Sequence, residues 1–275
     1  MPLRNTLASM ANKFFPKLYT NSIKSIVDRM GLHEASISIY DGIVYGISDG
    51  TYVCTISGVE AQFLVTSPTE FRRYDTLVGE QRVLERLIEE LRPDDIFYDV
   101  GANTGLYSCL TGQLLQEGHV VAFEPHPTNA DRLEENVSLN ELEVQALRVA
   151  LSDHDGAGSL GVAGDDVGAG HHRLVADDGA KRTVTVDVRT GDSIVRDGTA
   201  DPPDVMKIDV EGGELAVLRG FTETLQTCRL IICEAHGLTE AKEAHKQLEA
   251  LEYDVEVIEN RECVTFLLAE RPSSN

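Results

Sequence analysis

The sequence predicts an α/β fold built around a mostly parallel β-sheet. An apolar run at 95–98 leads into the turn Asp99-Val100-Gly101-Ala102-Asn103-Thr104-Gly105, and a segment with one apolar face follows at 106–115. Further strand-like apolar runs lie at 119–123, 144–149, 204–211 and 230–236. Strands that alternate with helical segments favour a parallel sheet with helical crossovers.

The glycine-containing turn predicts a ligand site at the sheet edge. A strand, a turn and a helix in this order bring backbone N–H groups to the carboxyl end of the strand, where open parallel sheets bind ligands. Because glycine has no Cβ, we expect a ligand to approach the backbone closely there. The predicted contacts are Asp99, Gly101, Ala102, Asn103 and Gly105.

The spacing of the glycines in the turn and the residue after the next strand indicate which class of ligand binds there. A dinucleotide fingerprint has a second glycine where this sequence has Asn103. The strand at 119–123 ends in Glu124-Pro125, and a carboxylate there accepts hydrogen bonds from ribose hydroxyls. Together they predict a nucleoside site without a pyrophosphate clamp, as S-adenosylmethionine (SAM) requires. The alternative is an ordinary turn with a surface glutamate.

The third strand run, 144–149, leads to Ser152 and Asp153. In a nucleoside site this strand end lies beside the base, where Asp153 could accept from an adenine amino group; a surface turn is the alternative. Residues 154–181 are rich in Gly, Ala and Asp and predict an exposed loop or short hairpin. His171-His172 lacks further ligands at defined spacing, so no metal site is predicted.

Ionisable residues gather on the last two parallel strands. Alternation puts Lys207, Asp209 and Glu211 on one face, and a lysine inside a parallel strand is costly unless it is paired. The next strand ends in Glu234 and His236. Because the two strands neighbour the first in a doubly wound sheet, we expect these side chains to meet Asp99 at one edge.

The cluster provides candidates for a general base. His236 ranks first, since its reference pKa of about 6.5 suits proton removal near neutrality. Asp209 and Glu211 follow, although either could instead hold the substrate or the SAM amino group. Lys207, held charged by its acidic neighbours, would fix their geometry. The alternative is a buried ion-pair network without a catalytic task.

Three motif regions resemble the FkbM family of SAM-dependent methyltransferases. They are Asp99 to Gly105, then Phe123-Glu124-Pro125, then Lys207 to Gly212 with Glu214 and Gly220. The similarity covers about residues 79 to 270 by motif positions. It implies a Rossmann-like seven-stranded sheet whose last strand is antiparallel, and O-methylation, often of sugars or natural products. We therefore expect methyl transfer to a saccharide or glycan hydroxyl.

Two other functions remain open at this point. One is an NAD-dependent oxidoreductase, which the missing middle glycine disfavours. The other is a non-catalytic SAM- or nucleotide-binding module, which would not need the ionisable cluster. The remaining predicted elements are helices at 80–91, 191–195 and 239–251, a strand at 183–186, and a closing antiparallel pair at 254–258 and 263–268.

Residues 1–78 are predicted to precede a methyltransferase domain at 79–275. Residues 1–31 form a basic amphipathic pattern that would contact an anionic membrane surface or a partner, or pack on the protein's own domain. Alternating segments within 36–66, punctuated by Asp-Gly and Ser-Gly pairs, predict a small antiparallel cap.

Composition sets outer bounds. A net charge of −22 disfavours nucleic acid as a partner, since phosphate binding needs a basic surface. No apolar run is long enough to span a bilayer, and five cysteines without a Cys-x-x-Cys pair suggest thiols, so a cytoplasmic protein is expected. Seven lysines against seventeen arginines, with 46 acidic residues, favour a protein adapted to high salt.

The charge predicts a dependence of stability on salt. At about 1 M salt the Debye length is roughly 3 Å, so surface carboxylates no longer repel one another. The melting temperature should therefore rise from low to molar KCl. A melting temperature that stays flat or falls over that range would show that the acidity is incidental.

Overall fold

The structure is a computed structural model that describes residues 50–77, 80–161, 167, 173–175, 182–261 and 263–272. The chain divides into two compact units, one of residues 1–54 and 62–79, the other of 55–61 and 80–275. The predicted basic helix and the first hairpin of the cap lie outside the described residues. Among those described, no helix is both long and apolar enough to cross a membrane.

A hairpin and one helix precede the main sheet in the chain. Strands β1 (Thr51–Ile56) and β2 (Val59–Leu64) pair as predicted for the second half of the cap. Helix α4 (Pro68–Thr76) was not predicted, although its cap was readable. Ser67 Oγ accepts from the Glu70 N–H at 3.2 Å, and Glu70 Oε2 accepts from the Thr66 N–H at 2.8 Å. A Ser-x-x-Glu spacing of this kind is a helix-start signal.

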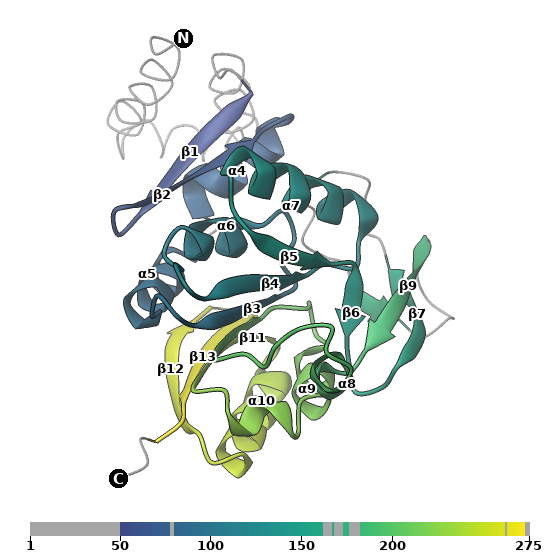
Figure 1. The fold of residues 1–275 in the computed structure, drawn as a ribbon. Helices are drawn as coiled ribbons and strands as arrows, with labels where there is room; N and C mark the ends of the chain where they lie inside the picture. Colours follow the sequence, from purple (N-terminus) through teal and green to yellow (C-terminus); the bar gives the residue numbers. More distant parts are fainter. Residues whose placement is uncertain are drawn as a thin grey trace, which may run out of the picture. The chain divides into compact units, whose positions relative to one another are not determined.

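The main sheet has seven strands in the order β12-β13-β11-β10-β3-β4-β5 (Figure 1). Neighbours β11, β10, β3, β4 and β5 pair in parallel, whereas β13 runs antiparallel to β11 and to β12. The predicted seven-stranded, mostly parallel sheet is therefore confirmed. Its strands are β3 (Ile96–Val100), β4 (His119–Phe123), β5 (Val144–Leu147), β10 (Val205–Ile208), β11 (Leu230–His236), β12 (Asp254–Asn260) and β13 (Val264–Glu270).

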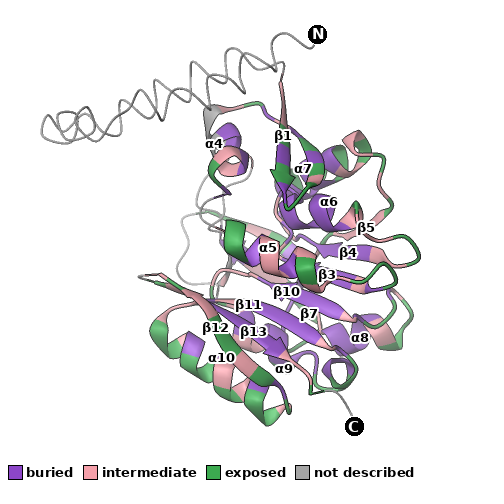
Figure 2. Cartoon of the chain, turned by 90° about the vertical axis from the view of Figure 1, so that its left-hand side faces the viewer, coloured by how far each residue is buried: buried purple, intermediate pink, exposed green. Residues whose placement is uncertain are grey.

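Helices cover both faces of this sheet. Helices α6 and α7 lie on one face and α9 and α10 on the other (Figure 1). The central strands are accordingly buried (Figure 2). The helices of this unit are α5 (Gln81–Glu90), α6 (Leu106–Gly112), α7 (Pro127–Leu139), α8 (Gly191–Arg196), α9 (Glu214–Arg219) and α10 (Leu238–Ala250), with a short 3₁₀ turn at Thr224–Gln226.

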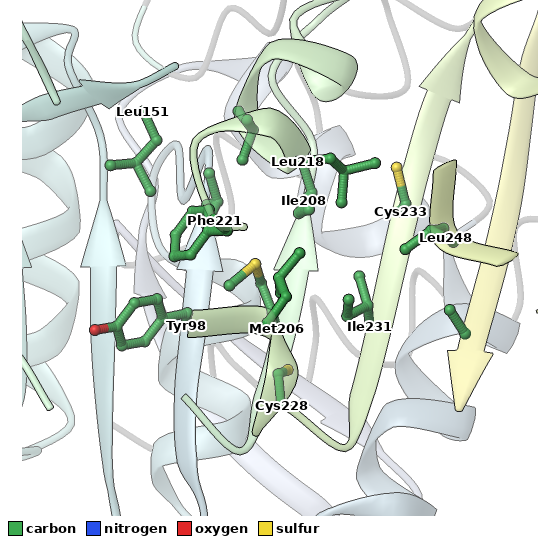
Figure 3. Close-up of a cluster of buried hydrophobic side chains, with 14 of the residues drawn as sticks. Tyr98, Leu151, Met206, Ile208, Leu218, Phe221, Cys228, Ile231, Cys233 and Leu248 are labelled. Atoms are coloured by element: carbon green, nitrogen blue, oxygen red, sulfur yellow. The ribbon is translucent and has the colours of Figure 1, made fainter. Parts of the chain in front are cut away.

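Alternation along β10 separates the hydrophobic core from the polar cluster. Met206 and Ile208 are fully buried and pack with Leu218 of α9 and Leu248 of α10 (Figure 3). Lys207 lies between them in sequence and therefore points to the opposite face of the sheet. The core thus fixes which face carries the ionisable residues of the neighbouring strands.

The third predicted strand is wrong in its extent. Strand β5 ends at Leu147, and the next residues pair elsewhere, as β6 (Val149–Leu151) in a second sheet of order β6-β9-β7-β8. That sheet also contains β7 (Gly156–Gly161), β8 (Arg173–Val175) and β9 (Thr183–Arg189), and it has its own small core. The antiparallel β7–β8 pair agrees with the predicted hairpin in 154–181, while His171-His172 lies outside the described residues.

Gly101 holds the ends of β3 and β10 together. Its φ is +81°, and a Cβ on it would lie 1.7 Å from the carbonyl oxygen of Asp209. The Asp209 N–H in turn donates to the Val100 carbonyl at 2.9 Å. The expectation that this glycine makes room for a ligand needs correction, because the room is filled by the chain's own backbone.

Gly101→Ala should destabilise the protein far more than the same substitution at a glycine that has a similar positive φ but no close neighbour. Gly198 is the matched control, since its φ is +75° and no atom lies within 4 Å of its absent Cβ. We expect Gly198→Ala to cost about 1 kcal/mol of unfolding free energy, and Gly101→Ala about 3 kcal/mol or more, measured by urea denaturation. Equal losses would show that the contact with Asp209 is unimportant.

Candidate active site

Glu124 is a buried carboxylate placed at the end of β4. It is 5% exposed, and its two oxygens accept hydrogen bonds from the backbone N–H groups of Asn103 and His126, each at 2.8 Å. Burial raises the pKa of Glu124 to about 7, although these two N–H groups oppose the rise. Each oxygen keeps a lone pair for a further donor such as a hydroxyl.

The amides of the glycine turn are already used. The N–H groups of Gly101 and Ala102 both donate to the Phe123 carbonyl at 3.0 Å, and that of Asn103 donates to Glu124. A pyrophosphate would need such amides free. Asn103 Oδ1, by contrast, is shielded from solvent and accepts no hydrogen bond from the described residues. The engaged amides therefore disfavour a pyrophosphate at this turn.

The other predicted cofactor contacts lie in different settings. Pro125 is half-buried and precedes His126, the N-cap of α7, while Gly105 is the N-cap of α6 with a φ of +86°. Ser152 is buried and Asp153 is exposed, and both follow β6 of the second sheet rather than the end of β5. A hydrogen bond from His154 lowers the pKa of Asp153. The contact of Ser152 and Asp153 with an adenine ring stays a prediction.

Lys207 is buried between two carboxylates. It pairs in register with Asp99 of β3, and its Nζ lies 3.2 Å from Asp209 Oδ2 and 3.8 Å from Asp99 Oδ1. The same ammonium lies 4.7 Å from the ring centroid of Tyr107. Burial favours the neutral amine, but the charges of Asp209 and Asp99 outweigh it and hold the pKa of Lys207 above its ordinary value.

Asp99 itself is fully shielded from water. Burial raises its pKa, while the charge of Lys207 and a 2.6 Å hydrogen bond from Ser108 Oγ oppose that rise. The expected pairing of the strand lysine with its acidic neighbours is thus present, and it links the first strand to the fourth parallel one.

His236 lies at the centre of a group of carboxylates. Its Nδ1 is 2.9 Å from Glu214 Oε1. Its Nε2 faces three further oxygens, Glu211 Oε2 at 3.4 Å, Glu234 Oε1 at 3.7 Å and Asp209 Oδ1 at 4.0 Å. All six ionisable residues expected at this edge therefore converge.

The pKa of His236 differs from the value used to rank it first as a base. Burial disfavours the imidazolium, but the hydrogen bond to Glu214 and the charges of Asp209 and Glu211 raise the pKa to about 9. The ranking of His236 as the first candidate for the general base, which rested on its reference pKa, therefore needs correction. In the same cluster, burial and the charge of Asp209 raise the pKa of Glu234 well above that of a free glutamic acid.

Glu214 was quoted within a motif but was given no role. It is 1% exposed, and its Oε1 accepts from the Gly212 N–H at 2.9 Å as well as meeting His236. Two features of the sequence could have identified it. It stands in the first turn of a helix, directly after a Gly-Gly pair, and it follows the acidic strand end by three residues.

Comparison with known proteins identifies the family. Residues 99–260 match the Methyltransferase FkbM domain. The chain belongs to the FkbM methyltransferase family. It is 33% identical over 219 residues to the hexuronic acid methyltransferase AglP of Haloferax volcanii, covering 80% of this chain and 88% of AglP. It is 26% identical over 159 residues to the 2-O-methyltransferase NoeI of Sinorhizobium fredii, covering 52% and 64%.

Among solved structures, an FkbM methyltransferase from Methylobacillus flagellatus superposes with a TM-score of 0.49 at 17% identity, covering 66% of this chain and 45% of that one. Family membership makes the protein a SAM-dependent methyltransferase. The NAD-dependent oxidoreductase and the non-catalytic module are thereby excluded. The engaged amides of the glycine turn agree with the exclusion of a dinucleotide-dependent oxidoreductase.

The Glu124 carboxylate should control SAM affinity. Glu124→Ala removes up to two charge-assisted hydrogen bonds to the ribose, each worth about 1.5–3 kcal/mol, and calorimetry would measure the loss. Unchanged affinity would contradict the assignment of Glu124 to the ribose.

The same carboxylate predicts a pH dependence of SAM affinity. The ionised form is the better acceptor, and the pKa of Glu124 in the free protein is about 7. Affinity should therefore rise with pH and fall by up to about tenfold per unit below that pKa. Glu124→Gln should remove this dependence, which separates it from titration of SAM itself.

Proposed function

We propose that this methyltransferase transfers the SAM methyl group to a hydroxyl of a saccharide or glycan. The observation that carries the proposal is the cluster around His236, which lies at the sheet edge next to the glycine turn and can receive a proton from a hydroxyl. The name of one relative, hexuronic acid methyltransferase, supports a saccharide acceptor. The name of another, 2-O-methyltransferase, supports transfer to oxygen.

The chemistry leaves two tasks to the protein. Bound SAM supplies an electrophilic methyl group on its sulfonium. The chain's own residues must orient the acceptor oxygen and take up its proton. The glycine turn with Glu124 serves binding, and the ionisable cluster serves the proton.

Glu211 is the residue to which we assign the proton. Of the carboxylates around His236, its side chain is the most exposed, at 24%, against 18% for Asp209, 13% for Glu234 and 2% for Glu214. Its backbone is left-handed, with a φ of +56°, a conformation that is uncommon outside glycine and clusters at functional sites. His236 Nε2 lies 3.4 Å from Glu211 Oε2, so this carboxylate faces the same cluster.

The acceptor is tested by incubating the protein with SAM labelled in the methyl group and a panel of neutral and uronic-acid-containing oligosaccharides, followed by mass spectrometry. The proposal expects a product that keeps its methyl group in mild alkali, as an ether does. A methyl group lost in alkali would mean a carboxyl ester and would contradict the hydroxyl. Transfer only to non-saccharide acceptors would contradict the saccharide.

With an acceptor identified, Glu211→Gln and His236→Ala should each lower kcat by about 10²-fold, while SAM affinity stays nearly unchanged. Glu243→Gln, an equal charge change at an exposed position of α10, is the matched control and should keep full activity. Full turnover in both cluster variants would show that the cluster is a structural ion-pair network.

A further inference from the structure

We propose that Asp209, Glu234 and His236 form a binding site for a divalent metal ion. Asp209 follows β10, while Glu234 and His236 lie two residues apart at the end of β11. One ligand atom from each residue lies within 4.8 Å of the other two. The sequence predicted no metal, because these ligands come from two separate strands and have no motif spacing in the chain.

The distances among the three proposed ligands suit a shared ion better than direct hydrogen bonds, although Glu211 Oε2 lies nearer to Nε2, at 3.4 Å. His236 Nε2 lies 3.7 Å from Glu234 Oε1 and 4.0 Å from Asp209 Oδ1, which is too far for hydrogen bonds. Ligand atoms about 2.1 Å from one ion lie at most about 4.2 Å apart. Small rotations of the side chains would therefore bring all three atoms onto one ion.

Neighbouring residues already orient two of the ligands. The imidazole Nδ1 of His236 is engaged by Glu214 at 2.9 Å, which directs Nε2 to the cluster. A carboxylate on the far nitrogen is the usual support of a histidine that binds metal. Lys207 holds Asp209 Oδ2 at 3.2 Å, and this leaves Oδ1 facing His236.

A second observation is independent of the spacing. Asp209 Oδ1 and Glu234 Oε2 are both shielded from solvent, and neither accepts a hydrogen bond from the described residues. A buried carboxylate oxygen without a donor is costly. A cation bound by Asp209 Oδ1 and the Glu234 carboxylate would offset this cost.

The ligand chemistry indicates the type of ion. Two carboxylates and one imidazole suit Mn²⁺ and related first-row ions better than Mg²⁺, which prefers oxygen ligands alone. The role of the ion in catalysis rests on the proposed function. As a Lewis acid it would bind the acceptor oxygen and lower the pKa of that hydroxyl. The hydroxyl proton passes to Glu211 as the O–CH₃ bond forms and the S–CH₃ bond breaks.

Binding is tested directly with Mn²⁺ and the full chain. A net charge of −22 attracts cations everywhere, so the titration is followed by electron paramagnetic resonance in about 2 M KCl, where exposed carboxylates are screened. We expect one saturable site per chain. Asp209→Asn and Glu234→Gln should each weaken Mn²⁺ binding at least tenfold, whereas the exposed control Glu243→Gln should not change it.

Pulsed resonance on the wild-type protein gives a readout that needs no variant. Bound Mn²⁺ should show coupling to an imidazole nitrogen, and His236→Gln should abolish it. Glu214→Gln, outside the ligand set, should weaken binding less than loss of a ligand. Binding without saturation, binding equal in all variants, or wild-type Mn²⁺ without nitrogen coupling would each overturn the site.

The test of the metal site can fail independently of the test of the proposed function. A protein that methylates saccharides but lacks the Mn²⁺ site would refute this inference alone. A protein that binds Mn²⁺ through His236 but transfers no methyl group to saccharides would refute the proposed acceptor alone. Melting curves and SAM calorimetry on each variant show whether it is folded.

Discussion

The positive charge of Lys207 is the interaction on which the rest of the site depends. An uncompensated ammonium inside a parallel sheet would cost several kcal/mol, so its position requires the carboxylates of Asp99 and Asp209. Asp99 belongs to the strand that carries the glycine turn, and Asp209 directly follows β10, in the segment that leads to Glu211. One buried cation therefore couples the cofactor-binding turn to the residues proposed to act on the acceptor.

More carboxylates than cations lie around His236. The electrostatic cost of this imbalance is visible in the pKa values of the group. Burial and mutual repulsion raise the pKa of Glu234, and in the ion-free protein the carboxylates hold the imidazole of His236 in its charged form. Metal binding at Nε2 would displace the proton on that nitrogen. Proteins tolerate such concentrations of like charge mainly where a ligand or a reaction needs them. The proposed metal ion and the proposed proton acceptor Glu211 are two uses of the same excess of negative charge.

The hydrophobic core permits this arrangement because strand side chains alternate. On β10 the core takes Met206 and Ile208, so Lys207 must face the other side, and the same rule places Glu234 and His236 together on β11. The parallel register aligns the neighbouring strands, so that Lys207 lies level with Asp99 of β3 and Ile232 of β11. Packing of apolar residues on one face thereby sets the geometry of polar residues on the other.

The sequence by itself determined the features that depend on local pattern: the individual parallel strands, the glycine turn, Glu124 after its strand, and Lys207 on the face opposite Met206 and Ile208. The seven-stranded sheet was implied by the family resemblance. The strand predicted at 204–211 is shorter, because β10 ends at Ile208 and Glu211 lies beyond it with a left-handed backbone. Only the tertiary structure decided the features that depend on residues distant in the chain. These are the break after Leu147, the contact of Gly101 with the Asp209 carbonyl, and the 2.9 Å approach of Glu214 to His236 across 22 residues. Periodicity specifies which way a side chain points, whereas its pKa and its partners follow from the register and burial that the whole fold imposes.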